Sequence, residues 1–122
     1  MWHFQTIVPV LKVSDLARSL AFYIDVLGFT VLWQAANDGG GENAMLTAGG
    51  ANLLLSTGAH LGGAPSFTGT LYFNMTGVDA FFTQIKDRVT LIWPLETMAY
   101  GQREFGLRDP DGYLLAFAEE TE

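Results

Sequence analysis

The sequence contains no cysteine in its 122 residues, which excludes disulfide bonds, thiolate zinc sites and catalysis by a thiol nucleophile. Basic residues are scarce: six lysines and arginines stand against 13 acidic residues, giving a formal net charge of -7. Nucleic acid is therefore not expected as a partner, because binding to phosphates requires a basic surface. An anionic membrane surface is disfavoured for the same reason.

Long apolar runs are also missing from the chain. No stretch approaches the roughly 18 residues of a membrane span, and residues 1–8 lack the basic and apolar segments of a signal peptide. We therefore expect a cytoplasmic protein. Hydrophobic residues make up 49% of the chain and charged residues 16%, which favours a folded core over disorder. One domain, residues 1–122, is expected at this length.

The chain divides into two related halves. Residues 29–33 (FTVLW) recur as residues 89–93 (VTLIW), and residues 42–54 match residues 103–115 loosely at nearly the same offset, which is half the chain length. This spacing predicts a duplicated module. We place the first module at about residues 1–57, a linker rich in glycine, proline and serine at residues 58–69, and the second module at about residues 70–122.

Each half carries the pattern of a strand, a helix and three further strands. The first half shows strand alternation over Ile7–Val13 and a helical pattern from an N-cap at Ser14 to a stop at Gly28. The second half repeats this pattern with a strand at Thr70–Met75 and a helix that starts near Gly77. The remaining strands are expected near 29–35, 43–48, 51–56, 89–95, 103–108 and 113–118. The sequence thus predicts an α+β fold of two βαβββ modules forming curved mixed sheets around a cavity.

The two faces of these sheets differ in character. Each predicted helix has one apolar stripe and can cover only one sheet face. The other face carries polar, small and mixed residues, among them Asn52, Leu54 and Tyr72. Such a mixture on an otherwise buried face indicates a pocket rather than packed core.

Motifs at both ends of the chain carry a family resemblance. The opening combines Val8-Pro-Val-Leu11 with a Leu-Gly-Phe ending at Phe29, and the last part combines Arg103-Glu-Phe, Leu107-Arg-Asp-Pro and an acidic tail ending at Glu120. These motifs resemble the vicinal oxygen chelate superfamily, which includes glyoxalase I, extradiol dioxygenases and the bleomycin resistance proteins, and they resemble the last group most. That resemblance implies a homodimer that exchanges its N-terminal strand at a hinge, which is Pro9 here.

The resemblance also implies where metal ligands would stand in the superfamily's enzymes. The corresponding positions here are Val8, Leu54, Thr70 and Ala116, none of which is a usual metal ligand. His3 and His60 are the only histidines, and a metal needs about three converging ligands. We therefore expect no metal, no cofactor and no catalytic residue.

Candidate ligand-binding residues are mainly aromatic. Trp33 and Trp93 occupy duplicate positions, where they either pack in the core or form an aromatic wall; a β-bulge would decide, because it changes the face. Adjacent Arg103 and Glu104 point to opposite faces of a strand, so one reaches the cavity while the other pairs outside, unless both form ordinary surface ion pairs. The full candidate set is Trp33, Asn52, Leu54, Tyr72, Trp93, Tyr100, Glu104 and Phe105.

Three functions remain open from sequence. One is a partner or sensor subunit, which a stable heteromer without ligand would support. The favoured one is non-catalytic binding and sequestration of an aromatic, cationic small molecule, as the resemblance to bleomycin resistance proteins implies and as the net charge of -7 supports. The alternative is an enzyme of the same superfamily, a lyase or isomerase of the glyoxalase type or a dioxygenase, acting on a small oxygenated substrate. It would need a metal held by other residues, or acid–base chemistry by Glu96, Tyr100 or Glu104.

Overall fold

The computed structural model describes residues 2–36 and 39–121, which form two four-stranded mixed sheets. In each sheet one strand pair is parallel and two pairs are antiparallel. The first sheet has the order β1 (Val10–Lys12), β4 (Ala51–Ser56), β3 (Glu42–Ala48) and β2 (Thr30–Ala36); the second has the order β5 (Thr70–Asn74), β8 (Leu114–Glu120), β7 (Gln102–Arg108) and β6 (Thr90–Thr97). The predicted α+β fold of two βαβββ modules is confirmed.

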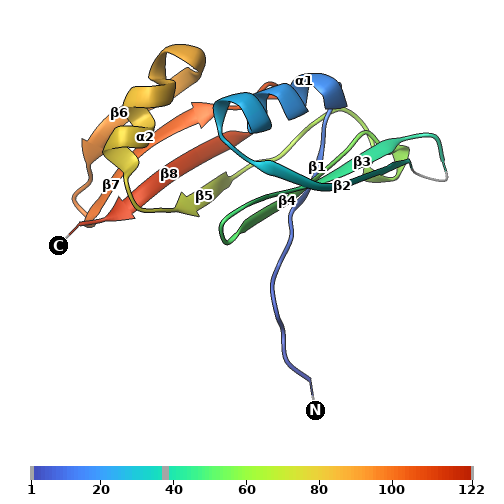
Figure 1. Cartoon of the computed structure of the whole chain (residues 1–122), viewed down its shortest axis with the longest axis horizontal. Helices are drawn as coiled ribbons and strands as arrows, with labels where there is room; N and C mark the ends of the chain where they lie inside the picture. Colours follow the sequence, from blue (N-terminus) through green and yellow to red (C-terminus); the bar gives the residue numbers. More distant parts are fainter. Residues whose placement is uncertain (1, 37–38, 122) are drawn as a thin grey trace.

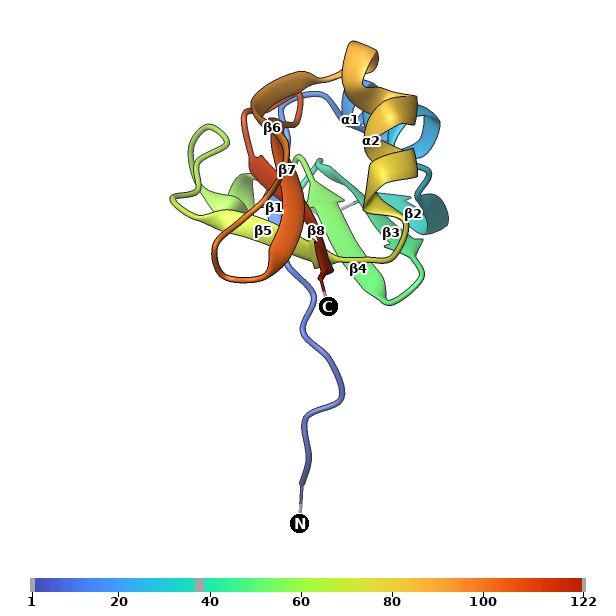
Figure 2. The same cartoon turned by 90° about the vertical axis from the view of Figure 1, so that its left-hand side faces the viewer.

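Both helices lie on the same side of the two sheets, whereas the N-terminal residues leave the body on the opposite side (Figures 1 and 2). The first helix, α1 (Leu16–Leu20), continues as a π-helix over Ala21–Val26, and the second, α2 (Val78–Ile85), continues as a 3₁₀ turn over Lys86–Arg88. A further 3₁₀ turn, Ala59–Leu61, lies in the connection between the modules. Within the described ranges no helix is long and apolar enough to cross a membrane.

The start of α1 differs from the sequence prediction. Asp15, not Ser14, caps the helix, because the Asp15 carboxylate accepts a hydrogen bond from the backbone N–H of Arg18. The Ser14 hydroxyl instead donates to Asp111 at the β7–β8 turn of the second module, 2.6 Å away. The end of the helical segment is as predicted, since Gly28 adopts a φ of 84° that favours glycine.

The first strand is shorter than predicted. It covers Val10–Lys12 rather than Ile7–Val13, and it pairs only with β4. Pro9 explains why the strand begins only at Val10, because proline has no N–H to donate to a neighbouring strand. The Pro9 carbonyl still accepts a hydrogen bond from Leu54 N. Before Pro9, the side chains of Trp2, Phe4 and Ile7 are 81%, 92% and 86% exposed.

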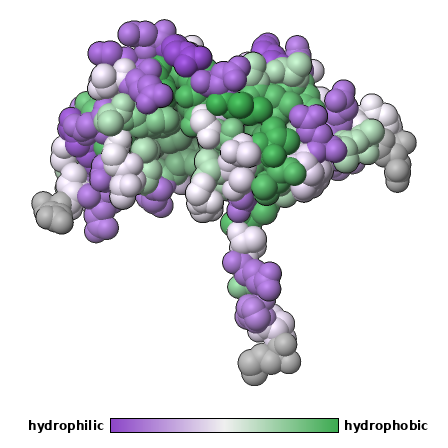
Figure 3. Space-filling model, viewed as in Figure 1, coloured by the Kyte–Doolittle hydropathy of each residue, from purple (hydrophilic) through white to green (hydrophobic). Residues whose placement is uncertain are grey.

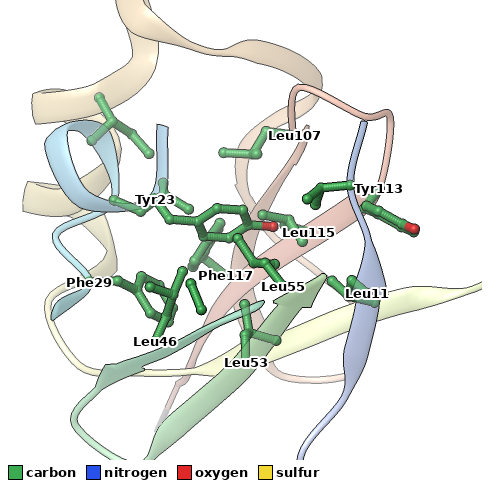
Figure 4. Packing of buried hydrophobic residues seen from close by; sticks show 14 of the residues in the cluster. Leu11, Tyr23, Phe29, Leu46, Leu53, Leu55, Leu107, Tyr113, Leu115 and Phe117 are labelled. Atoms are coloured by element: carbon green, nitrogen blue, oxygen red, sulfur yellow. The ribbon is translucent and has the colours of Figure 1, made fainter. Parts of the chain in front are cut away.

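A single hydrophobic core joins the two modules. Tyr23 lies among side chains of both, with Phe29 and Leu46 from the first module and Leu107 and Leu115 from the second (Figure 4). On the outside, hydrophobic residues gather between the modules, and hydrophilic residues lie over the outer surface of the helices (Figure 3). The aromatic ring contacts Tyr23–Phe29 and Phe29–Phe73 continue the core across the boundary.

A buried hydrogen bond ties this core together. The Tyr23 hydroxyl donates to Asp109 Oδ2 at 2.8 Å, and both residues are buried. Asp109 Oδ1 accepts the backbone N–H groups of Asp111 and Tyr113 at 2.9 Å each. Burial raises the pKa of the Asp109 carboxyl above its usual 3.8, although these three hydrogen bonds lower it.

We predict that Tyr23→Phe destabilises the protein more at neutral pH than at acidic pH. A hydrogen bond to a charged carboxylate contributes about 1.5–3 kcal/mol, and its loss leaves Asp109 less well satisfied. Folding raises the pKa of the Asp109 carboxyl. The protonated carboxyl therefore adds to the folding stability at a pH below the pKa of the unfolded chain, and this contribution is lost as the pH rises through the pKa of the folded protein. The hydrogen bond from Tyr23 lowers the Asp109 pKa, so its removal increases the stability lost between acidic and neutral pH.

Urea unfolding across the acidic and neutral range measures the difference. Tyr113→Phe is the matched control, because its hydroxyl donates to the Lys12 carbonyl and not to a carboxylate. The control should cost about 0.5–1.5 kcal/mol at every pH. The same cost for Tyr23→Phe at all pH values would contradict the prediction.

Candidate ligand-binding site

A β-bulge in each module turns a tryptophan onto the face opposite the helices. In β2, Val31 pairs with the buried core residue Leu46, and the register then shifts so that Trp33 pairs with Met45. Without the shift, Trp33 would share the core face with Val31, because side chains alternate along a strand. The indole therefore belongs to the open face of the first sheet.

The second module repeats this bulge at the corresponding position. Leu91 pairs with the buried core residue Leu107, and after the shift Trp93 pairs with Gly106. Both tryptophans thus lie on the sheet face opposite the core. Trp33 remains 45% exposed, whereas Trp93 is half-buried against its own sheet.

Gly106 provides the surface on which the Trp93 indole lies. A Cβ atom at this position would stand 2.5 Å from two ring carbons, so any side chain larger than hydrogen would displace the ring. The Trp93 Nε1 atom is buried and has no acceptor within the described part of the chain, so packing rather than a hydrogen bond positions the indole. The role of Gly106 was not predicted from the sequence. The sign of it was that the second module has a glycine where the first module has Met45.

A buried carboxylate lies on the same face of β7, two residues from Gly106. Glu104 is only 2% exposed, and the hydroxyls of Tyr72 on β5 and Tyr100 in the β6–β7 turn both donate short hydrogen bonds to its Oε1 atom. The structure therefore brings together three of the candidate residues, Tyr72, Tyr100 and Glu104, which come from two strands and a turn. Glu96 on β6 pairs in register with Glu104 and places a second, exposed carboxylate nearby.

Both phenols in this cluster are held in their neutral form. Burial is the main cause that raises the pKa of Tyr72, and the hydrogen bond to Glu104 adds to it. The hydrogen bond to Glu104 is the main cause that raises the pKa of Tyr100, which is largely exposed. Both phenols thus remain hydrogen-bond donors at neutral pH.

Arg103 points away from this cluster. Its Nε atom lies 2.7 Å from Asp79 Oδ1 on α2, on the helix side of the sheet. Glu104 thus lies on the open face of the sheet, and Arg103 forms an ion pair on the helix side. Consequently, Arg103 does not neutralise Glu104.

The remaining candidates fall in different places. Leu54 pairs in register with Met45, so it lies on the open face of the first sheet, in one row with Trp33. Asn52 and Tyr72 line one groove of about 410 Å³ next to Pro9. The candidates are therefore divided between the two sheets. Asn52 of the first sheet and Tyr72 of the second line the same groove.

The expectation that Phe105 lines the site is wrong. Its side chain is fully buried on the core face of β7, where its ring stacks on Phe117 and packs edge-on against Phe82 of α2. Phe105 neighbours Glu104 in the strand, and neighbouring side chains point to opposite faces. Once Glu104 faces the site, Phe105 must face the helix.

Metal-ligating side chains do not gather in the described ranges. Among residues 2–36 and 39–121, no group of three or more His, Cys, Asp or Glu side chains is placed to hold a metal ion. His3 lies in the extended N-terminal segment, and His60 lies in the 3₁₀ turn that follows β4.

We predict that Gly106→Ala destabilises the protein by lifting the Trp93 indole. Overpacking of this kind costs about 1–3 kcal/mol. In a Trp93→Ala background the same substitution should cost less than about 0.5 kcal/mol, because the clashing ring is gone. Urea unfolding of the four proteins in this double-mutant cycle gives the coupling. An equal cost of Gly106→Ala in both backgrounds would show that the indole does not rest on Gly106.

Comparison with known proteins identifies the family. A family model of the Glyoxalase/Bleomycin resistance protein/Dioxygenase superfamily matches residues 3–117. Bleomycin resistance proteins from Geobacillus stearothermophilus and Staphylococcus aureus are each 25% identical to the chain over 141 residues, an alignment that covers 93% of this chain and 95% of the relative.

Solved structures share the fold of this chain. A protein of unknown function from Agrobacterium tumefaciens str. C58 is 30% identical with a TM-score of 0.77, covering 98% of this chain and 97% of its own. TnmS3, an antibiotic binding protein from Streptomyces sp. CB03234, is 20% identical with a TM-score of 0.79 and 99% coverage of both chains, which shows a shared fold. The chain belongs to the glyoxalase/bleomycin resistance protein/dioxygenase superfamily.

Proposed function

We propose that the protein binds and sequesters an aromatic, cationic small molecule without chemical conversion. The observation that carries this proposal is the open face of the second sheet, where Trp93 lies on Gly106 and where Tyr72 and Tyr100 both donate to Glu104, two residues from Gly106 on β7. The curated relatives named bleomycin resistance proteins are consistent with a role in binding such a compound.

Physical chemistry favours this class of ligand. A cation placed over an indole face gains about 0.5–2 kcal/mol, and an offset-stacked ring contact contributes about 0.5–1.5 kcal/mol. The buried Glu104 carboxylate and the exposed Glu96 make the face negative, in agreement with the net charge of -7. An anionic metabolite would be repelled by the same charges.

The second part of the proposal is a homodimer that exchanges its N-terminal segments at Pro9. Trp2, Phe4 and Ile7 are almost fully exposed, and burying such side chains against another chain is favourable. The parallel pairing of β1 with β4 covers three residue pairs, whereas the corresponding pairing of β5 with β8 covers five. The first sheet therefore has room for further strand pairing beside β4.

Ligand binding is predicted to depend on Trp93. In titrations with bleomycin followed by calorimetry, Trp93→Ala should weaken binding by at least about fivefold, since one stacked cationic contact contributes about 1 kcal/mol or more. Raising the salt concentration should weaken binding further by screening the carboxylates. Trp33→Ala is the matched control on the other sheet and should have a smaller effect. Binding that persists unchanged in both variants would refute the aromatic surface, and tight binding of an anion with no binding of aromatic cations would refute the proposal.

Assembly is predicted to depend on the N-terminal segment. Sedimentation of the intact chain at micromolar concentration should give about twice the 13.3 kDa of the monomer. Deleting residues 1–8 should shift the protein toward the monomer, because the exposed apolar side chains and any exchanged ladder hydrogen bonds are lost. The truncated chain keeps β1, so far-UV circular dichroism should show that both sheets remain folded. A monomeric intact chain would contradict the dimer.

A further inference from the structure

The two oxygens of the Glu104 carboxylate are not equivalent. Both phenols, from Tyr72 and Tyr100, donate to Oε1. No residue within the described ranges donates a hydrogen bond to Oε2. A carboxylate offers about four lone-pair positions, so the second oxygen of this buried anion retains its full capacity to accept.

No cation of the described chain compensates this charge. The neighbouring Arg103 lies on the other face of the sheet and is paired with Asp79. The group in register with Glu104 is another carboxylate, Glu96. A charge that is 2% exposed and has no cationic partner is costly to bury. A bound cation on the open face would relieve that cost.

Two phenols fix the position of the carboxylate. Tyr72 comes from β5 and Tyr100 from the β6–β7 turn, so the Glu104 side chain is held from two separate elements. Gly106, which carries the Trp93 indole, lies two residues further along β7 on the same face, which corresponds to about 7 Å. This separation matches an aromatic ring that carries a cationic group at its edge.

We propose that Glu104 Oε2 anchors a cation that bears N–H donors, namely an amidinium, guanidinium or protonated amine, attached to an aromatic ring that lies on Trp93. This inference rests on the proposed function and makes it more specific. A quaternary ammonium has the same charge but no N–H group, and it can use only the aromatic faces. Tyr72 and Tyr100 act as positioning residues for the carboxylate.

Three probes on one ring test this inference. They are 2-naphthamidine, which carries an N–H cation, its quaternary analogue 2-naphthyltrimethylammonium, and the neutral 2-naphthamide. Calorimetry on the intact protein should show that the amidinium binds about tenfold or more tightly than either of the others, as expected for a charge-assisted hydrogen bond.

Two isosteric variants separate the local contact from general charge. Glu104→Gln should reduce the preference for the amidinium to less than about threefold, a difference well below one charge-assisted hydrogen bond. Glu96→Gln removes the same charge from the exposed neighbour in register and should retain most of the preference. If Glu104→Gln fails to fold, Glu104→Asp retains the charge but withdraws it by one methylene, and it should lose the preference while still binding the ring.

The possible outcomes distinguish this inference from the proposed function. Similar affinity for all three probes would overturn the anchoring role of Glu104 and leave aromatic binding intact. An equal loss of preference in Glu96→Gln and Glu104→Gln would also overturn it, because general electrostatics would then suffice. No binding of any probe at millimolar concentration would overturn both this inference and the proposed aromatic site.

Discussion

The hydrogen bond between Tyr23 and Asp109 lies where the two modules share one core, and the remaining architecture follows from that sharing. Tyr23 belongs to the first module and Asp109 to the second, and both are buried. Because the helices and the common core cover one face of both sheets, the apolar side chains of the strands are directed to that face. Within residues 2–36 and 39–121, no helix covers the opposite face.

That face carries the side chains that we propose contact a ligand. The bulges before Trp33 and Trp93 are the structural devices that bring large aromatic side chains there instead of into the core. Glu104 is tolerated on the same face because two phenols satisfy one of its oxygens. The chemistry of the site therefore comes from local departures from regular strand geometry, which the common core is large enough to accommodate.

The architecture was readable from sequence because it depends on local periodicity and on a repeat. Strand alternation, the stop at Gly28 and the matching halves all survive in the structure. The site was harder to predict from the sequence, because a bulge changes the sheet face of every residue after it. The sequence gives no direct sign of where the unpaired residue of a bulge lies. The link between Tyr72 and Glu104 spans 32 positions and depends on tertiary structure. Phe105, in contrast, could have been rejected, since it and adjacent Glu104 cannot face the same side.

The duplicated sheets differ most simply at one position, where the first module has Met45 and the second has Gly106. Trp33, which pairs with Met45, is 45% exposed, while the absence of a side chain at Gly106 lets Trp93 settle against the backbone. Both halves thus carry a tryptophan at the same position, but Trp33 projects into solvent whereas Trp93 lies against the sheet. A duplicated fold can in this manner acquire two unlike surfaces through one exchange of side-chain volume, with the strand order of both halves preserved.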